Sequence, residues 1–165
     1  MKRKAIIREI IEYIFIFIIV VALVWAMDTY LIVNAQIPSE SMENTIMTGD
    51  RIIGNRLAYR NHIPQRFDIV IFKYPDDESV LYIKRIIGLP GDTVRITDGK
   101  VYINDSVEPL DDSFTAEIPI GDFGPYHVPG NSYFVLGDNR NYSFDSRYWE
   151  NSFVHEDQIL GKAVF

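Results

Sequence analysis

The sequence predicts a mostly β protein with one transmembrane helix near its N-terminus, and two observations support this fold class. The run IIEYIFIFIIVVALVWAM, residues 10–27, contains a single charged residue, Glu12, and a helix of roughly 20 apolar residues can cross a bilayer. The later apolar runs are short, alternate in polarity and end at Gly, Pro, Asn or Asp, which is typical of β-strands. We therefore expect a membrane helix followed by an antiparallel β-sheet domain.

The charges around the apolar run predict its orientation. Four basic residues precede the run: Lys2, Arg3, Lys4 and Arg8. After the run, no Lys or Arg occurs before Arg51. Because the cytoplasmic flanks of membrane helices are enriched in Lys and Arg, we expect a cytoplasmic N-terminus and a domain on the outer face of the cell membrane.

These features divide the chain into three parts. We expect a cytoplasmic basic segment over residues 1–9, a transmembrane signal anchor over 10–33 and an extracytoplasmic domain over 34–165. A cleaved signal peptide is the alternative, because VWA at 24–26 and VNA at 33–35 have the small-residue pattern of a cleavage site. The anchor is favoured because the apolar run exceeds the roughly 7–15 residues usual in a signal peptide.

The composition excludes several classes of function. The chain has 16 Lys and Arg against 23 Asp and Glu, and without the four N-terminal cations 12 remain against 23, a net charge of −11. A domain this acidic does not suit nucleic-acid binding. The absence of Cys excludes thiol catalysis, disulfides and thiolate metal sites. We expect no metal and no cofactor.

The expected strands follow one another along the domain. Asp98-Gly99 predicts a hairpin turn, because Gly tolerates the positive φ that such turns require. Residues 105–130 are rich in Pro, Gly and Asp and predict a long surface connection. The stretches with strand patterns are RIIGNRLAY (51–59), DIVIFKYP (68–75), SVLYIKRIIG (79–88), TVRITDGKVYIND (93–105), SYFVLGD (132–138) and GKAVF (161–165).

Two serines, Ser39 and Ser41, stand one residue apart in IPSESMENTIMTGD, shortly after the apolar run. They are either ordinary turn residues or include a nucleophile, and a nucleophilic Ser needs a base to take its proton. The histidines lie in polar, turn-like stretches and none sits in a signature with an acid, so a Ser-His-Asp triad is possible but unsupported. They are His62, His127 and His155.

A lysine is the other candidate base, since Ser-Lys pairs are a variant of the catalytic triad. Lys84 lies in the apolar stretch VLYIKRIIG, and burial lowers the pKa of a lysine from its usual value. Strand alternation places Lys84 and Arg85 on opposite faces, so at least one of them should face the core or a cleft. An edge strand with two solvated cations is the alternative, and Lys73, with weaker apolar flanks, is the second candidate.

A third stretch, GDNRNYSFDSR at 137–147, is dense in hydrogen-bonding groups. Asp145 and Arg147 could pair along one side of the backbone, and Ser143 could orient a base. Turn formation is the structural alternative. Arg140 excludes a calcium loop, because it occupies a position where an oxygen ligand belongs. Glycosylation sequons at 104–106 and 141–143 are common chance matches.

Taken in order, PSESM, YIKRIIGLPGD and GDNRNYSFDSR resemble the motifs of type I signal peptidases. These are membrane-anchored Ser-Lys proteases, and the chain is most similar to their small single-span bacterial form over nearly its whole length. The resemblance implies a β-sheet catalytic domain of the signal-peptidase type. It also implies a serine endopeptidase that removes signal peptides from exported preproteins at the bilayer, with the export machinery as a possible partner.

The resemblance assigns roles to the residues of the three motifs. It implies that Ser41 is the nucleophile and Lys84 the general base, with Ser143 hydrogen-bonded to Lys84. The backbone N–H of Ser41 and the hydroxyl of Ser39 would form the oxyanion hole, because residues two apart in an extended segment face the same way. The other implied residues are Asp145 and Arg147, with Asp138 and Arg140 as further support, and Met42 and Tyr82 lining the site or substrate groove.

One position departs from the family pattern. The family usually has Pro after the Met-x pair of SMxPT, whereas this chain has Asn44 in SMENT. Pro fixes φ, so Asn44 predicts a less rigid turn next to Ser41. Two alternatives stay open: a weakly active paralogue or protease dedicated to one partner, and a non-catalytic membrane-anchored binding domain.

Overall fold

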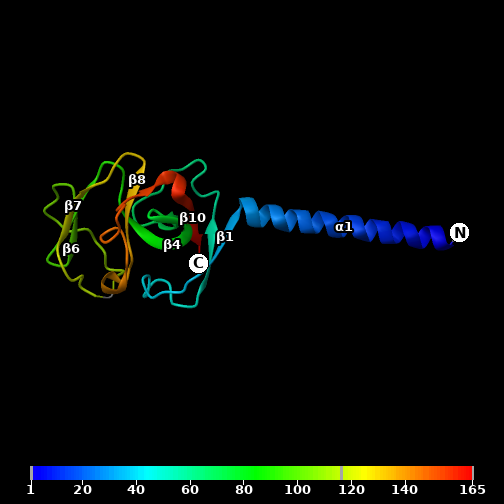
Figure 1. The fold of residues 1–165 in the computed structure, drawn as a ribbon, viewed down its shortest axis with the longest axis horizontal. Coiled ribbons are helices and arrows are strands. Elements are labelled where there is room, and N and C mark those ends of the chain that lie inside the picture. Colours follow the sequence, from blue (N-terminus) through cyan, green and yellow to red (C-terminus); the bar gives the residue numbers. More distant parts are fainter. Residues whose placement is uncertain (1, 116, 165) are drawn as a thin grey trace.

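The computed structural model describes residues 2–115 and 117–164, with side chains from residue 6 onward. The N-terminal helix α1 spans Lys2–Tyr30 and extends from the β domain as a separate rod (Figure 1). Its segment Ile6–Tyr30 is long and apolar enough to cross a membrane. The side chains of Lys2, Arg3 and Lys4, part of the expected basic segment, lie outside the described residues.

The helix ends three residues before the end of the expected anchor. Leu31 follows it, and Ile32 and Val33 belong to strand β1. The physical reason is that this stretch pairs with strand β2 along its full length. Val33 is also 5% exposed and packs in the core, so apolar residues that could extend the anchor instead join the sheet.

The domain consists of two antiparallel sheets, which confirms the mostly β fold class. One sheet has seven strands in the order β1-β2-β10-β3-β4-β8-β9, and the other has three in the order β6-β5-β7. Two short 3-10 helices complete it, Arg140–Tyr142 and Glu156–Gln158. The strands are β1 Ile32–Gln36, β2 Arg51–Asn55, β3 Ile69–Tyr74, β4 Asp77–Gly88, β5 Thr93–Thr97, β6 Lys100–Ile103, β7 Phe123–His127, β8 Ser132–Leu136, β9 Val154–His155 and β10 Ile159–Val164.

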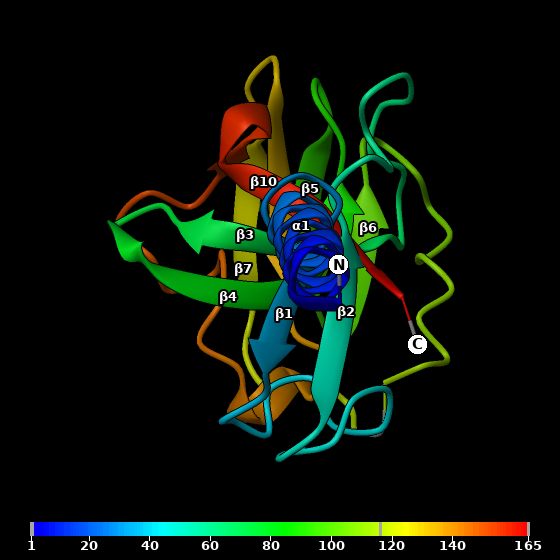
Figure 2. The same ribbon diagram turned by 90° about the vertical axis from the view of Figure 1, so that its right-hand side faces the viewer.

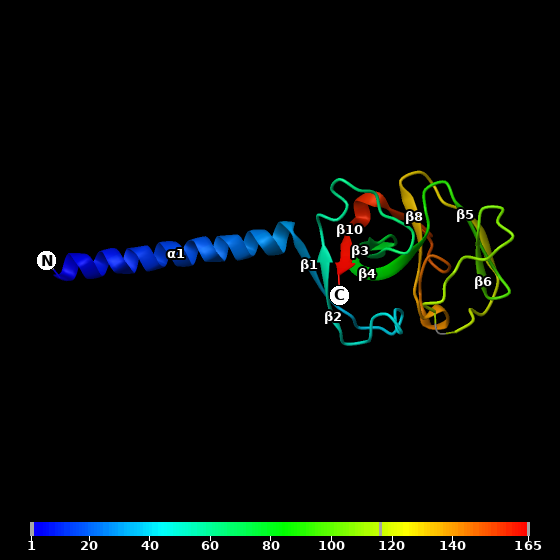
Figure 3. The same cartoon turned by 180° about the vertical axis from the view of Figure 1, so that it is seen from behind.

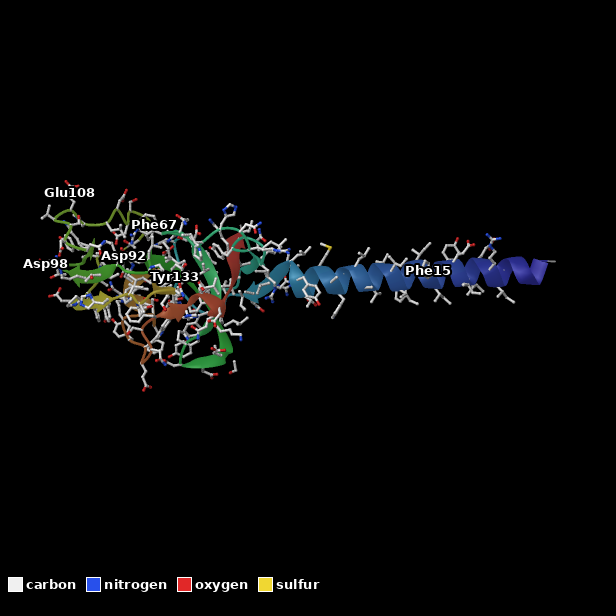
Figure 4. All side chains as sticks on the ribbon, turned by 90° about the horizontal axis from the view of Figure 1, so that it is seen from above. Phe15, Phe67, Asp92, Asp98, Glu108 and Tyr133 are labelled. Carbon is white, nitrogen blue, oxygen red and sulfur yellow. The ribbon has the colours of Figure 1, made fainter. Side chains whose placement is uncertain are left out.

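The two sheets lie at different distances from the helix. Figure 2, which looks along α1, shows β1, β2 and β10 at the end of the domain from which the helix leaves. In Figure 3 the β5–β6 hairpin lies at the opposite end. Asp98 and Glu108 also lie there, far from Phe15 on the helix (Figure 4). The hairpin expected at Asp98-Gly99 is confirmed, with both residues at positive φ, 49° and 70°.

Strand β4 is central to the larger sheet. It pairs with β3 on one side and with β8 on the other, so the alternative of an edge strand with two solvated cations is wrong. Its side chains enter three apolar clusters through Ile83, Ile86 and Ile87. The pairing with β8 begins only at Arg85, which leaves one edge of the preceding residues free next to a cleft.

Candidate active site

The segment between β1 and β2 carries the two serines in a bend and a turn rather than in an extended conformation. Glu43 N–H donates to Glu40 O, and Thr45 N–H donates to Met42 O. This differs from the extended arrangement expected for Ser39 and Ser41. Their Oγ atoms are nevertheless 3.3 Å apart, because the bend brings the two hydroxyls together.

Asn44 explains how this turn closes. It has φ 82° and is the third residue of the turn that the Thr45–Met42 hydrogen bond closes, and Asn tolerates such a positive φ better than most residues. Pro is fixed near −65° and does not fit this conformation. The departure from the family's Pro therefore corresponds to a different, specific backbone conformation.

Ser41 and Lys84 meet in a buried position. Lys84 Nζ donates to Ser41 Oγ at 2.6 Å, and the two residues are 4% and 6% exposed, Lys84 being the less exposed. Met42 anchors the turn beneath them, since its side chain is fully buried in the core. The arrangement places a hydroxyl within hydrogen-bond reach of an amine in water-poor surroundings.

Burial controls the charge of Lys84. Loss of hydration lowers the pKa of Lys84 from 10.5 to about 8, because a low-dielectric environment disfavours the charged amine. Asp145 and Asp138 partly oppose this change, while the charge of Arg147 adds to it. Among the described residues, no carboxylate lies within ion-pair distance of Lys84, and its amine also lies 5.4 Å from the centroid of the Tyr82 ring.

Ser143 lies close to this pair but does not bind Lys84. Its Oγ is buried and has no hydrogen-bond partner among residues 2–115 and 117–164, which differs from the implied Ser143–Lys84 bond. Lys84 points its amine at Ser41 instead. A Cβ on Gly137 would lie 2.2 Å from Ser143 Oγ and 2.4 Å from Ser41 O, so only glycine fits at position 137, where the two segments approach.

Asp145 and Arg147 form the expected pair, fully buried. Arg147 Nε lies 2.7 Å from Asp145 Oδ1, and Gly137 N–H donates to Asp145 Oδ2 at 3.0 Å. The loop that carries Ser143 is thus closed on itself. It is also fastened to residues 39–45, which carry Ser39 and Ser41 and are called the serine turn below, because Asn139 N–H donates to Ser41 O at 3.2 Å.

Asp138 has two partners that sequence reasoning missed. Arg85 Nη2 lies 2.6 Å from Asp138 Oδ2, and Thr45 Oγ1 donates to the same oxygen at 2.5 Å. Asp138 is fully buried. The available signal was the adjacent pair Lys84-Arg85, whose alternation sends the arginine to the other face of β4 from the lysine.

Arg140 is held by the connection expected at 105–130. Its Nη1 lies 2.8 Å from Asp112 Oδ2. The neighbouring Asn141 side chain donates to Glu117 Oε2 at 2.9 Å and accepts from Ile120 N–H at 2.9 Å, so the amide of the 141–143 sequon is already engaged. No sequence signal marked Asp112 as the partner of Arg140.

A cleft of about 550 Å³ opens over Ser41 and Lys84. It is lined by residues of β1, of the turn that carries Ser41 and of the free edge of β4, and by Tyr142 and Phe144. Tyr82 lines the cleft, whereas Met42 lies below it in the core. The other candidate bases lie elsewhere: His62, His127, His155 and Lys73 are not among the residues that line the cleft.

The described residues contain no group of His, Asp or Glu that could hold a metal ion. Lys73, the second candidate base, is half-exposed and lies 3.3 Å from Glu78. His155 lies 2.6 Å from Asp157 at the surface. The chemistry that the cleft can support is therefore that of a buried serine hydroxyl beside an amine of lowered pKa.

Comparisons with known proteins identify the family of this chain. The family model described as "Signal peptidase, peptidase S26" matches residues 10–165. Probable signal peptidase I-2 of Synechocystis sp. is 46% identical over 132 residues, which cover 77% of this chain and 59% of that protein. Signal peptidase I of Leptolyngbya laminosa is 39% identical over 152 residues, which cover 87% and 72%.

A solved structure shows the same fold. The crystal structure of a signal peptidase I from Enterococcus faecalis matches with a TM-score of 0.51 and 38% sequence identity. The match covers 61% of this chain and 96% of that chain. The chain spans about three fifths of the Synechocystis relative's length.

Proposed function

This chain belongs to the signal peptidase family, peptidase S26, and we propose that it removes N-terminal signal peptides from exported preproteins with a Ser41–Lys84 dyad. The observation that carries the proposal is the 2.6 Å contact between Lys84 Nζ and Ser41 Oγ. This contact lies inside a cleft where burial lowers the pKa of Lys84 to about 8. A general base works best when its pKa is near the working pH.

The reaction follows from these two groups. Neutral Lys84 takes the proton of Ser41 as Oγ attacks the scissile carbonyl. The C–N bond then breaks, Lys84 gives its proton to the leaving amine, and an ester links the signal peptide to Ser41. Neutral Lys84 next takes a proton from water, whose oxygen attacks the ester, and the proton returns to Ser41 as the peptide leaves.

The nearby hydroxyls support the charged states of this reaction. The backbone N–H of Ser41 and the Ser39 hydroxyl would stabilise the oxyanion, a role worth about 10²–10³ in rate for one donor. Ser143 Oγ, which has no partner among the described residues, is available to accept from Lys84 once Ser41 is esterified. Asp145, Arg147 and Asp138 would keep the surrounding loop in place.

The cleft suits an extended peptide. Within residues 2–115 and 117–164, β1 pairs only with β2, and the residues of β4 before Arg85 pair only with β3, so two free strand edges face the cleft. Backbone pairing with such edges is a general way to bind extended chains. The family's preference for small side chains at positions −1 and −3 would then be set by the apolar floor between these edges.

The helix would place this site beside its substrate. We propose that α1 anchors the protein in the cell membrane with a cytoplasmic N-terminus, leaving residues 34–165 on the outer face. Arg56 fastens the domain to the helix end, because its backbone N–H donates to Leu31 O and its Nε donates to Ile32 O, both at 3.0 Å. A substrate held in the same bilayer gains effective concentration at the cleft.

The test is cleavage of a signal-bearing preprotein by the full-length protein in detergent, with the cut located by mass spectrometry. We expect a cut after an Ala-x-Ala-like site, and a loss of roughly 10⁴-fold or more in Ser41→Ala and Lys84→Ala. Lys73→Ala, which changes a lysine outside the cleft, is the matched control and should retain activity. Activity that survives Lys84→Ala would sink the dyad.

A further inference from the structure

Two exposed aromatic side chains flank the buried Ser143. Tyr142 is 63% exposed and Phe144 is 51% exposed, whereas Ser143 is 5% exposed. Ser143 has an extended backbone, with φ −117° and ψ 122°, and in such a backbone successive side chains point to opposite sides. Burying Ser143 next to Ser41 therefore turns both aromatic rings outward.

Both rings line the same cleft as Ser41 and Lys84. The edges of β1 and β4 and the turn that carries Ser41 supply most of the other lining residues, so the aromatic pair is a wall that belongs to neither strand edge. An extended chain rises roughly 3.3 Å per residue. A peptide whose residues before the cut lie between the strand edges would thus carry its next residues past Tyr142 and Phe144.

Phe144 is held in place by other aromatic rings. Its centroid lies 6.3 Å from that of Tyr74 and 6.4 Å from that of Tyr148. Tyr74 in turn stacks on Tyr82 at 4.7 Å, and Tyr82 borders Lys84. A ring that is fixed before binding loses little conformational freedom when a ligand covers it.

We propose that Tyr142 and Phe144 bind the first residues of the released mature chain and favour apolar or aromatic side chains there. The inference rests on the proposed peptidase function. Its chemistry is that of aromatic faces, which gain most from flat or apolar partners removed from water. The pair would act on the leaving side of the scissile bond, where it affects acylation but not hydrolysis of the ester.

The experiment compares two preproteins with the same signal peptide and cut site, one continuing with Phe-Leu and the other with Gly-Ser. For the full-length protein in detergent we expect kcat/KM to be roughly tenfold higher for Phe-Leu, the factor that one aromatic contact of about 1.4 kcal/mol provides. Tyr142→Ala and Phe144→Ala should each reduce this ratio toward one. Tyr142→Phe, which keeps the ring, should keep the ratio.

Two controls separate binding from general damage. Tyr102→Ala removes an aromatic ring from β6, at the far end of the domain, and should leave the ratio unchanged. A signal-peptide ester with a simple alcohol as leaving group lacks the mature residues, so Phe144→Ala should slow it far less than the Phe-Leu preprotein. Equal slowing of both would indicate a structural role and overturn the proposal.

The outcomes also separate this inference from the proposed function. Cleavage by wild type with no preference between the two preproteins would overturn the inference and leave the peptidase function intact. No cleavage of either preprotein by wild type would overturn both. A preference that persists in Tyr142→Ala and Phe144→Ala would assign it to other residues and overturn the inference.

Discussion

Arg85 and Lys84 are adjacent cations on opposite faces of strand β4, and their partners differ. On one face, Arg85 has a buried carboxylate at 2.6 Å, the Phe67 carbonyl at 3.0 Å and the Phe114 ring at 4.1 Å. On the other face, Lys84 has a serine hydroxyl and an aromatic ring but no paired carboxylate. The Arg85–Asp138 pair joins β4 to the loop after β8, whereas burial lowers the pKa of Lys84, as its proposed role of general base requires.

The serine turn joins these two faces. Ser41 at its start contacts Lys84, and Thr45 at its end donates to Asp138 and lies 3.3 Å from Arg85 Nη2. The structural ion pair on one face therefore fixes the turn that presents the hydroxyl on the other. A substitution at Arg85 should therefore change mainly the free energy of unfolding. A substitution near Lys84 should change mainly the pKa of its amine.

The largest change in stability should come from Arg85→Met. Loss of the guanidinium leaves Asp138 as a buried, unpaired charge, which costs about 3–5 kcal/mol. We expect the free energy of unfolding to fall by this amount in urea denaturation of the full-length protein. Arg95→Met is the matched control, since Arg95 is exposed and packs over Tyr102, and a loss of equal size there would contradict the assignment.

Lys84→Met should raise the free energy of unfolding, whereas Arg85→Met lowers it. The pKa of Lys84 is lower in the folded state, about 8 against 10.5, so the folded state binds its proton more weakly than the unfolded state. This costs stability fully below pH 8, and the cost vanishes as the pH rises to 10.5. Removing the amine should therefore stabilise the protein at pH 7 by about 1–3 kcal/mol.

Urea denaturation of Lys84→Met at a series of pH values measures this difference. The gain over wild type should be constant below pH 8 and shrink between pH 8 and 10.5. Destabilisation of Lys84→Met at pH 7, similar to that of Arg85→Met, would show that the two faces do not differ in the way described.

The pH dependence of cleavage sharpens the contrast further. Because the base must be neutral, kcat/KM should rise about tenfold per pH unit below the pKa of Lys84 and level off above about 8. A profile that does not level off near pH 8 would contradict Lys84 as the base. Asp145→Asn should move the limb to lower pH, since the carboxylate raises the pKa of Lys84.

The smallest effect should come from the turn that connects the faces. Asn44 has φ 82°, a conformation that costs most residues about 1–2 kcal/mol but costs Gly nothing. Asn44→Ala should lower the free energy of unfolding by about 1–2 kcal/mol and should raise the activation free energy that kcat/KM reports by a similar amount. Asn44→Gly should match wild type in both measurements. Equal losses in both variants, measured by urea denaturation and preprotein cleavage, would assign the role of Asn44 to its side chain.

Much of the fold could be predicted because its signals are local. Alternation and turn residues identified the strand stretches, and Asp98-Gly99 identified the hairpin. Strand β1 was missed because its first apolar residues continue the apolar run of the helix. They form a strand because they pair with β2, which lies later in the chain. Strand β7 was missed because Gly and Pro within FGPYH conceal its alternation.

The candidate site was predictable as three motifs but not as a set of contacts. The structure brings Ser41, Lys84 and Ser143 together from segments far apart in the chain. Their fixation depends on partners with no pattern of their own, such as Asp112 for Arg140 and Thr45 for Asp138. Such pairings are set by tertiary packing, which a single sequence does not encode in any periodicity.

The short junction between the helix and the sheet limits how far Ser41 can move relative to the end of α1. One residue, Leu31, separates α1 from β1, and its carbonyl accepts from the backbone N–H of Arg56, the residue after β2. With the helix in a bilayer, so short a junction leaves the height of Ser41 above the lipid nearly fixed. Under the proposed function, this height would limit the number of residues between a substrate's apolar segment and the bond that is cut, independently of which side chains surround that bond.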